Sequence, residues 1–312
     1  MPGSLLRRAR SRVRSWLIDE TWTVGIVDRP IASFLLRPTL ADARWLPPPR
    51  GGYLADPFGL PDHDAILVER FDHAGNLGRL VAITPDGALR DPQPFDRPLR
   101  GHASFPFLAA IDGTVFCLPE NAAGGRLDLW RRDPEGRFRP VATVADDLPA
   151  ADAALFPWNG RWWIAFTDLR LGAHDNLCLL HAETPGGPWR PHRRHPVKRG
   201  TGSSRSGGTP FVHAGELYRP AQDCGSTYGA AIVINRVLEL SPDRFAEEPV
   251  ARIAPDPSSP YPDGAHTLSA WGERTLVDAK RHGFVPAAFR RRVLGRLGRL
   301  PDLTTKTQES PA

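Results

Sequence analysis

Residues 154–168 read ALFPWNGRWWIAFTD, two apolar runs joined by Asn159-Gly160 and ended by an acid. An Asn-Gly pair between apolar segments is a strong signal for a tight β-hairpin. The same arrangement of an apolar pair, a short turn and a second apolar strand with a polar end occurs four more times. One apolar marker in each first strand identifies the five repeats: Phe58, Phe107, Phe156, Phe211 and Leu268.

The markers are separated by 49, 49, 55 and 57 residues, a spacing typical of β-propeller blades. The fifth repeat runs out of chain after Asp278, so we expect residues 22–27 to return, complete the fifth blade and hide its open edge. The sequence therefore predicts an all-β fold, a five-bladed β-propeller with short basic helices at both termini; a β-sandwich with coincidental spacing is the alternative. Further strands are predicted between the repeats, at 79–83, 127–131, 138–144, 177–181, 230–234 and 237–240.

The predicted organisation has four parts. Residues 1–20 are a basic amphipathic segment, residues 21–283 the propeller, residues 284–300 a basic amphipathic helix, and residues 301–312 a disordered tail. A length of 312 residues would also allow two domains on size alone.

The composition is that of a globular protein, with 41% hydrophobic and 24% charged residues. Gly 29 and Pro 33 indicate many short strands and turns. No apolar run approaches the ~18 residues of a membrane-spanning helix, and the N-terminus lacks the apolar region of a secretory signal. Cys117, Cys178 and Cys224 form neither a zinc pattern nor a disulfide framework, which fits a reduced, cytoplasmic location.

The charge is unevenly distributed. Residues 1–16 carry +5, residues 280–300 carry +7 and residues 301–312 carry −1, which leaves −6 on residues 17–279 within a total of +5. A nucleic-acid-binding face should appear as basic charge within the folded body, so we expect no nucleic-acid partner.

The basic C-terminal segment has the pattern of an amphipathic helix. Its apolar residues follow helical spacing among arginines: Phe289, Val293, Leu294, Leu297 and Leu300. Such a helix is typical of a membrane-surface element. We expect peripheral attachment to the inner membrane face; the alternative is that both basic ends pack on the propeller.

The repeat also predicts where chemistry could occur. In each blade, the start of the first strand and the end of the second lie on the same face of the ring. The residues at the first position are Asp56, Phe105, Ala154, Thr209 and His266. Those at the second position are Glu69, Glu120, Asp168, Gln222-Asp223 and Asp278. The acids would converge on one mouth of the central tunnel, although any one of them could be a solvated turn residue.

Three groups of candidate residues follow from this placement. Asp56 is a plausible general base at the tunnel mouth. Residues 219–229 combine a cation, an amide, an acid and a phenol, the mixture that sugar recognition needs. Four cations could together bind a phosphate: Arg205, Arg219, Lys280 and Arg281.

Some other signals are weak. Asp62-His63-Asp64 resembles a metal-binding motif but lies in a hairpin turn, and His192 and His195 read as surface loop. His266 could ligate an ion, hold a water or be a buried core histidine. We predict no cofactor and no metal.

The order of several motifs resembles one known family. They are Asp56-Pro57-Phe58, Ser104-Phe105-Pro106-Phe107, Leu118-Pro119-Glu120, Tyr218-Arg219-Pro220-Ala221-Gln222-Asp223-Cys224, His266-Thr267-Leu268-Ser269 and Val277-Asp278-Ala279-Lys280-Arg281. Over residues 22–281 the sequence resembles the N-terminal domain family of glucosamine inositolphosphorylceramide transferase, whose bacterial members are often called formyltransferase-like. One departure is Arg205-Ser206-Gly207-Gly208, where the family usually has Arg-Pro-Ala-Gly.

The resemblance implies a propeller akin to arabinanase-type glycosidases and glycosyl transfer onto a lipid-linked or glycan acceptor. Plant members carry a separate glycosyltransferase domain that this sequence does not contain. Arabinanase-type enzymes use an aspartate base in blade one, which Asp56 matches, and a glutamate acid entering blade four. Residues 207–210 hold no glutamate there, so Glu120 or Asp223 would have to supply the acid.

A transferase with a phosphate-activated donor fits these residues best, because cations can stabilise the leaving phosphate. An inverting glycoside hydrolase of arabinanase type and a non-catalytic glycan-binding propeller remain the alternatives. The predicted catalytic residues are Asp56, Glu120 and Asp223. The predicted substrate-binding residues are Arg205, Arg219, Gln222, Tyr228, His266, Asp278, Lys280 and Arg281.

Overall fold

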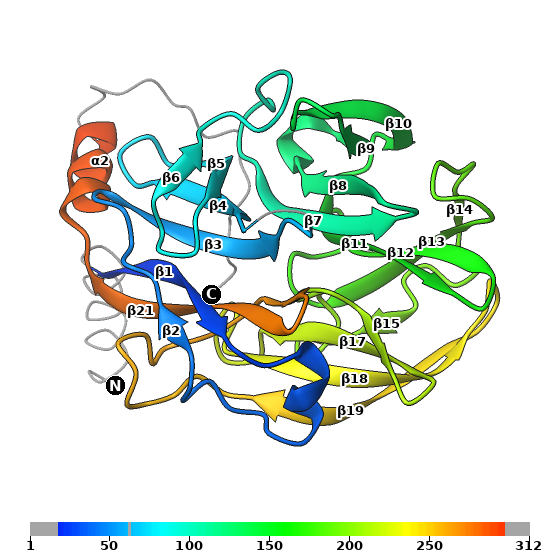
Figure 1. The fold of residues 1–312 in the computed structure, drawn as a ribbon. Coiled ribbons are helices and arrows are strands. Elements are labelled where there is room, and N and C mark those ends of the chain that lie inside the picture. The colour runs from blue at the N-terminus through cyan, green and yellow to red at the C-terminus, as the bar shows by residue number, and fades with distance from the viewer. Residues whose placement is uncertain (1–17, 62–63, 297–312) are drawn as a thin grey trace, which may run out of the picture.

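The computed structural model describes residues 18–61 and 64–296 (Figure 1). Its strands form five antiparallel sheets, one for each repeat, so the predicted five-bladed β-propeller is confirmed. Parts of three predictions lie outside the described residues: the N-terminal segment up to residue 17, the turn at Asp62-His63, and residues 297–312.

Each blade runs from an inner first strand to an outer last strand. Blade one contains β3 (Gly52–Gly59), β4 (Ile66–Asp72), β5 (Leu77–Ile83) and β6 (Leu89–Asp91). Blade two contains β7 (Ser104–Ile111), β8 (Thr114–Glu120), β9 (Arg126–Arg132) and β10 (Phe138–Asp146). Blade three contains β11 (Ala150–Trp158), β12 (Arg161–Asp168), β13 (Asn176–Ala182) and β14 (Arg190–Pro191), with β15 (Lys198–Arg199) also paired to β13.

Blade four contains β16 (Phe211–His213), β17 (Glu216–Asp223), β18 (Ala231–Leu240) and β19 (Phe245–Ile253). The two strands expected at 230–234 and 237–240 are one continuous strand, β18, whose pairing with β19 is interrupted by register shifts. The interpretation as two strands was wrong because Asn235-Arg236 continue the strand and do not form a turn. The fourth strand, β19, was not predicted.

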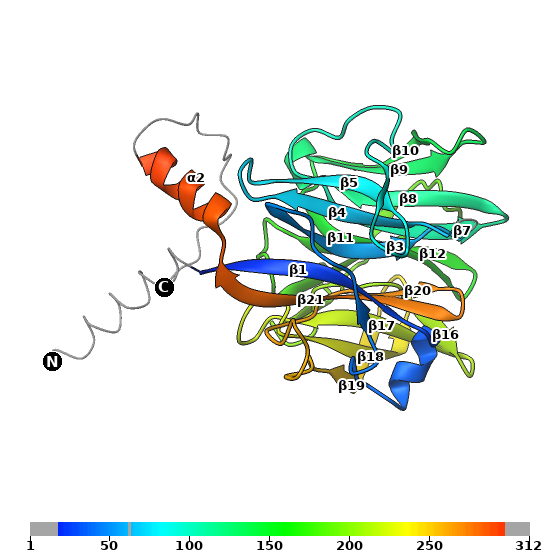
Figure 2. The same ribbon diagram turned by 60° about the vertical axis from the view of Figure 1, so that its left-hand side comes forward.

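Blade five joins the two ends of the chain. It contains β20 (Leu268–Trp271), β21 (Arg274–Phe284), β1 (Ile18–Val27) and β2 (Arg44–Trp45). The register runs from Ile18 opposite Phe284 to Val27 opposite Thr275, and Figure 2 shows β1 lying along β21. The predicted closure by residues 22–27 is confirmed. The strand is longer than expected, and it covers an edge that would otherwise be open to another chain.

Tight hairpins and aromatic packing between blades account for this arrangement. At Asn159-Gly160 both residues have positive φ, 49° and 71°, the backbone that a two-residue hairpin turn requires. Phe58 of blade one packs edge-on against Phe105 and Phe107 of blade two, with ring centroids 5.0 and 5.4 Å apart. Such contacts bury large apolar areas between neighbouring sheets.

The inner strands of blades one, two and three share one irregularity. Asp56, Phe105 and Asp152 are non-glycine residues with φ of 51°, 40° and 51°, and each lies at a register shift of its hairpin. The residue of blade three that is equivalent to Asp56 is therefore Asp152, and the assignment of Ala154 was wrong. The bulge lies between Ala55 and Phe58 in blade one and between Ala151 and Ala154 in blade three, so Ala154 corresponds to Phe58 and counting back from Phe156 misses Asp152 by two residues.

A short basic helix, α2 (Pro286–Arg296), follows β21 and lies beyond the neighbouring ends of β1 and β21 (Figure 2). Its Ala288 is buried, and Nη2 of Arg292 lies 2.7 Å from Oδ2 of Asp19 on β1. Among the described residues, no helix has the length and apolarity to cross a bilayer.

Candidate functional site

The bulges place the carboxyl group of one blade against the backbone of the next. The N–H of Asp56 donates to Oδ2 of Asp278 at 3.0 Å, and the N–H of Phe105 donates to Oδ2 of Asp56 at 3.2 Å. The N–H of Asp152 donates to Oε2 of Glu120 at 3.0 Å. A bulge leaves backbone donors without a strand partner, and buried donors must be satisfied. These acids therefore hold the blade junctions.

We call Asp56, Glu120, Asp152, His266 and Asp278 the axial group. Asp56, Asp152, His266 and Asp278 are at most 5% exposed, while Glu120 is half-buried. They come from blades one, two, three and five. Non-glycine residues at positive φ such as Asp56 and Asp152 store strain of about 1–3 kcal/mol each, which is typical of functional sites.

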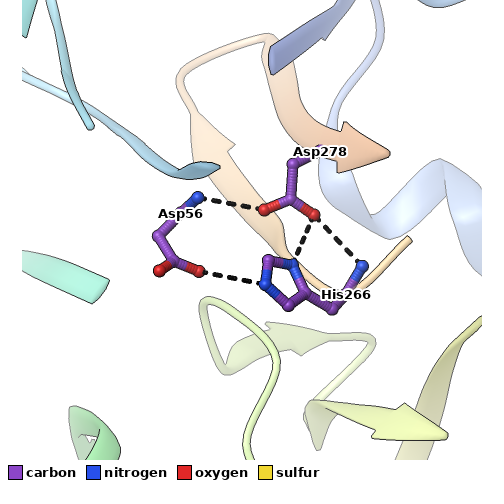
Figure 3. A group of neighbouring side chains, drawn as sticks. All are labelled: Asp56, His266 and Asp278. Atoms are coloured by element: carbon purple, nitrogen blue, oxygen red, sulfur yellow. Dashed lines mark hydrogen bonds and ion pairs between the residues drawn. The ribbon is translucent and has the colours of Figure 1, made fainter. Parts of the chain in front are cut away.

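His266 links the two aspartates of the axial group (Figure 3). Its Nδ1 lies 2.6 Å from Oδ1 of Asp278, and its Nε2 lies 3.6 Å from Oδ1 of Asp56. Trp22 of β1 stacks on the imidazole with ring centroids 4.0 Å apart. Burial opposes the charge on His266, but the carboxylate of Asp278 outweighs it and raises the pKa of His266. The two acids therefore favour the protonated form of the ring.

The same three residues are those whose donor atoms could surround a cation. One ligand atom from each of Asp56, His266 and Asp278 lies within 4.8 Å of the others. In this arrangement Nδ1 of His266 and Oδ1 of Asp278 are joined by a hydrogen bond. A metal would have to displace the proton between these two atoms.

Asp152 is the centre of a second set of contacts. Its Oδ2 accepts from Nε of Arg205 at 2.5 Å and from Nε2 of Gln222 at 2.7 Å. The guanidinium of Arg205 lies 4.9 Å from the ring centroid of Tyr228, and Tyr228 packs edge-on to His266 at 5.1 Å. Tyr228 is half-buried, so this part of the site reaches the surface.

The pKa values of two axial carboxyl groups differ from each other. Burial, opposed by His266 and reinforced by Asp278, raises the pKa of Asp56 to about 6. Burial and the charge of Asp152 raise the pKa of Glu120 to about 8. At pH 7 Asp56 is therefore mostly ionised and Glu120 mostly protonated. Two acids held in opposite protonation states are the signature of paired acid–base chemistry.

Several predicted site residues are brought together and others are not. Asp56, Glu120, Arg205, Gln222, Tyr228, His266 and Asp278 belong to the contacts described above. Asp223 does not: its Oδ2 lies 3.0 Å from Arg252 at the outer edge of blade four. It follows Gln222 in a strand, and successive side chains of a strand point to opposite faces.

Three of the four cations expected to form a phosphate clamp have partners outside the axial group. Arg219 is buried and bidentate to Glu247, with Nη2 2.6 Å from Oε1. Nζ of Lys280, itself fully buried, lies 2.5 Å from Oε1 of Glu20. The guanidinium of Arg281 lies over the ring of Tyr261. Of these cations, only Arg205 contacts the axial group.

The expectation that all five acids at the second-strand ends converge was also wrong in part. Asp168 is paired with Arg170 at 2.9 Å, as Asp223 is with Arg252. Sequence reasoning assigned no role to Asp152, gave Trp22 only a place in the closing strand, and noted Glu69 only for its position. Asp152 could have been found from the motif Ala-Asp before an apolar pair, which it shares with Asp56. Trp22 had no sequence signal beyond the expected strand.

The chain is similar to one protein family and to two plant proteins of that family's name. Residues 99–259 match the family described as "Glucosamine inositolphosphorylceramide transferase 1, N-terminal". The Oryza sativa subsp. indica glucosamine inositolphosphorylceramide transferase 1 is 32% identical over 154 residues, 48% of this chain and 21% of that protein. The Arabidopsis thaliana protein of the same name is 29% identical over 205 residues, 62% of this chain and 27% of that protein. The chain thus spans about a quarter of the length of these relatives.

A solved structure with the same fold is an exo-beta-1,3-galactanase from Clostridium thermocellum. It has a TM-score of 0.51 and 10% sequence identity, and the match covers 67% of this chain and 53% of the galactanase. This likeness concerns the fold alone. The family match contains Glu120, Asp152 and Arg205 and covers more than half of the 312 residues. The chain therefore belongs to the family of glucosamine inositolphosphorylceramide transferase 1 N-terminal domains.

Proposed function

We propose that this propeller is a carbohydrate-active enzyme that transfers a sugar from a phosphate-activated donor to a glycan or glycolipid acceptor. The observation that carries the proposal is the pair formed by Asp56 and Glu120, whose pKa values are raised to about 6 and about 8. The names of the relatives, which are glycolipid transferases, support a sugar donor and a lipid-linked acceptor.

The two carboxyl groups suit the two proton transfers of the reaction. Asp56, ionised at pH 7, would accept the proton of the acceptor hydroxyl. The oxygen of that hydroxyl would form the new bond to the anomeric carbon. Glu120, protonated at pH 7, would donate its proton to the phosphate oxygen as the old glycosidic bond breaks. Arg205 is the cation that contacts the axial group, through Asp152. Its guanidinium fork suits phosphate oxygens.

An inverting glycoside hydrolase is the second candidate, and the same observation favours it. Such enzymes use one carboxylate as base toward water and one carboxylic acid toward the leaving oxygen. Three of the four predicted cations have partners outside the axial group: Arg219, Lys280 and Arg281. Fewer cations therefore remain to hold a leaving phosphate than the sequence predicted. A non-catalytic glycan-binding propeller is the third candidate.

The experiment is an assay with nucleoside-diphosphate and polyprenyl-phosphate sugars, with and without a glycan or glycolipid acceptor. The proposal expects product only when the acceptor is present; release of free sugar without acceptor would identify a hydrolase. The rate should follow a bell-shaped pH profile with limbs near pH 6 and pH 8. Glu120→Gln should lower the rate by about 10²–10⁴-fold and remove the alkaline limb. Asp56→Asn that spares both turnover and the acidic limb would contradict the proposal.

We also propose that the protein works in the cytoplasm at the inner face of a membrane. Helix α2 carries Arg290, Arg291, Arg292 and Arg296 and no acid, whereas residues 17–279 carry −6. Each cation near an anionic bilayer adds about 1 kcal/mol of attraction. A basic edge on an acidic body would orient the propeller toward a lipid-linked acceptor.

A further inference from the structure

Glu69, at the end of the apolar run in β4, is a buried carboxyl group that the proposed mechanism does not use. It is opposite Ala55 in the β3–β4 pair, one residue before the bulge at Asp56. The residue is 4% exposed, and its Oε1 is buried without a hydrogen bond to the described part of the chain. An unsatisfied buried oxygen next to the axial group requires an explanation.

The equivalent acids of other blades hold a blade junction, and Glu69 does not. Asp278 accepts the N–H of Asp56, and Glu120 accepts the N–H of Asp152. The corresponding donor for Glu69 would be the N–H of Phe105, but Oδ2 of Asp56 already accepts it. The carboxyl group of Glu69 is therefore available for another partner.

The packing around Glu69 fixes its position. Gly78 lies so close that a Cβ there would be 2.1 Å from Oε1 of Glu69. The N–H of Gly78 donates to Nδ1 of His102 at 3.1 Å, so the neutral imidazole carries its proton on Nε2. That Nε2 lies 3.3 Å from Oε1 of Glu69. Burial also lowers the pKa of His102, which favours the neutral form of this imidazole.

The charges around Glu69 disfavour its ionised form. Four carboxyl groups act on it from neighbouring strands: Asp56 of β3, Glu120 of β8, Asp152 of β11 and Asp278 of β21. Burial and these charges raise the pKa of Glu69 well above its usual range. His102, which precedes β7, is the imidazole facing it, and Tyr53 of β3 is a further titratable group that interacts with it. A neutral carboxyl has one O–H to donate, and Nε2 of His102 lies close to Oε1 without forming a hydrogen bond to it.

We infer that Glu69 is a further ligand-binding residue, a neutral carboxyl that donates its O–H to a sugar hydroxyl, and that His102 is its positioning residue. The sugar as the ligand class rests on the proposed function. The state of Glu69 and its dependence on His102 do not, because both belong to the protein without ligand. A neutral donor beside the axial carboxylates suits an uncharged hydroxyl better than an anion.

Infrared spectra of the ligand-free protein at pH 7.5 test the state of Glu69. The difference between wild type and Glu69→Gln should show the loss of a protonated-carboxyl C=O band, and Glu273→Gln, at an exposed turn, should not. Loss of an ionised-carboxylate band would overturn the inference. His102→Ala should shift the frequency of the Glu69 band, whereas His213→Ala, at an exposed position, should leave it unchanged. An unshifted band in His102→Ala would remove the positioning role.

Binding of arabinose, glucose and galactose, followed by tryptophan fluorescence, tests the ligand. Glu69→Ala should weaken binding about tenfold, the effect of one lost hydrogen bond, and Glu69→Gln, which keeps a neutral donor, should weaken it less. Equal weakening by both variants would overturn the donor role. A wild-type protein that binds no sugar would contradict the proposed function and the sugar as ligand, while the infrared result would still decide the state of Glu69.

Discussion

Oδ1 of Asp278 lies 2.6 Å from Nδ1 of His266 and also accepts the backbone N–H groups of His266 and Thr267. Its Oδ2 accepts the N–H of Asp56, 222 positions away in the chain. One carboxylate therefore connects the last blade to the first and orients the imidazole between two acids. It has both a structural and an electrostatic role.

Asp278→Asn should destabilise the propeller by about 3–5 kcal/mol, because it removes one partner of a buried ion pair and leaves the other uncompensated. Urea unfolding measures this loss. Asp243→Asn is the matched control, since the Asp243 side chain is 65% exposed, and a surface change of this kind should stay within about 0.5 kcal/mol. Similar midpoints for the two variants would contradict the role of Asp278.

Thermal stability should decrease as the pH rises from 5 to 9. The pKa values of Asp56 and Glu120 are raised in the folded state to about 6 and about 8 from 3.8 and 4.5, so folding binds protons. The stability that this adds is complete below the unfolded pKa values and is lost as the pH rises through the folded ones. His266, whose pKa is also raised, acts in the same direction. Calorimetry should show that Glu120→Gln flattens the curve near pH 8; an unchanged slope would contradict this pKa.

Arg219 should behave as a structural residue. It pairs with buried Glu247, which also contacts Lys198 at 2.7 Å, so Arg219→Met should cost about 3–5 kcal/mol. The double variant Arg219→Met with Glu247→Met should recover part of that loss, because an apolar pair can replace a buried ion pair. Urea unfolding of the three proteins tests this. If Arg219→Met unfolds like wild type but loses ligand binding, the phosphate clamp expected from the sequence would regain support.

Removing the strand that closes the ring should destabilise all five blades. Deletion of residues 1–28 removes β1 and exposes the edge of β21, to which β1 pairs along its whole length. Deletion of residues 1–17 keeps β1 and is the control. Thermal melting should be lower and less cooperative for the longer deletion. Equal melting of the two deletion variants would mean that closure contributes little.

Attachment to membranes should require anionic lipid and the basic C-terminal segment. The protein should float with anionic liposomes and not with neutral ones, and high salt should abolish binding because it screens the charges. Deletion of residues 286–312 should abolish flotation, since it removes helix α2. Equal recovery with neutral and anionic vesicles, or no loss after the deletion, would contradict attachment through the basic C-terminal segment.

Much of the fold could be predicted from the sequence because blade repeats are local. The hairpin at Asn159-Gly160 and the apolar markers such as Phe58 and Phe156 depend on turn chemistry and alternation within about ten residues. The return of residues 22–27 also followed, since a blade with missing strands leaves an edge that must be paired. The strand β19, which follows a turn with mixed polar residues, lacked such a signal.

The site was only partly predictable, for a physical reason. The repeats predicted which polar residues lie at strand ends, and so identified Asp56, Glu120, Asp278 and His266. The pairing of charges became known from the folded arrangement: Arg219 with Glu247, Lys280 with Glu20, and Arg205 with Asp152. A buried charge must find a counter-charge, and that partner is set by distances between strands far apart in the chain. The contact of Asp152 with Arg205 joins residues 53 positions apart, so neither local spacing nor turn chemistry could predict it.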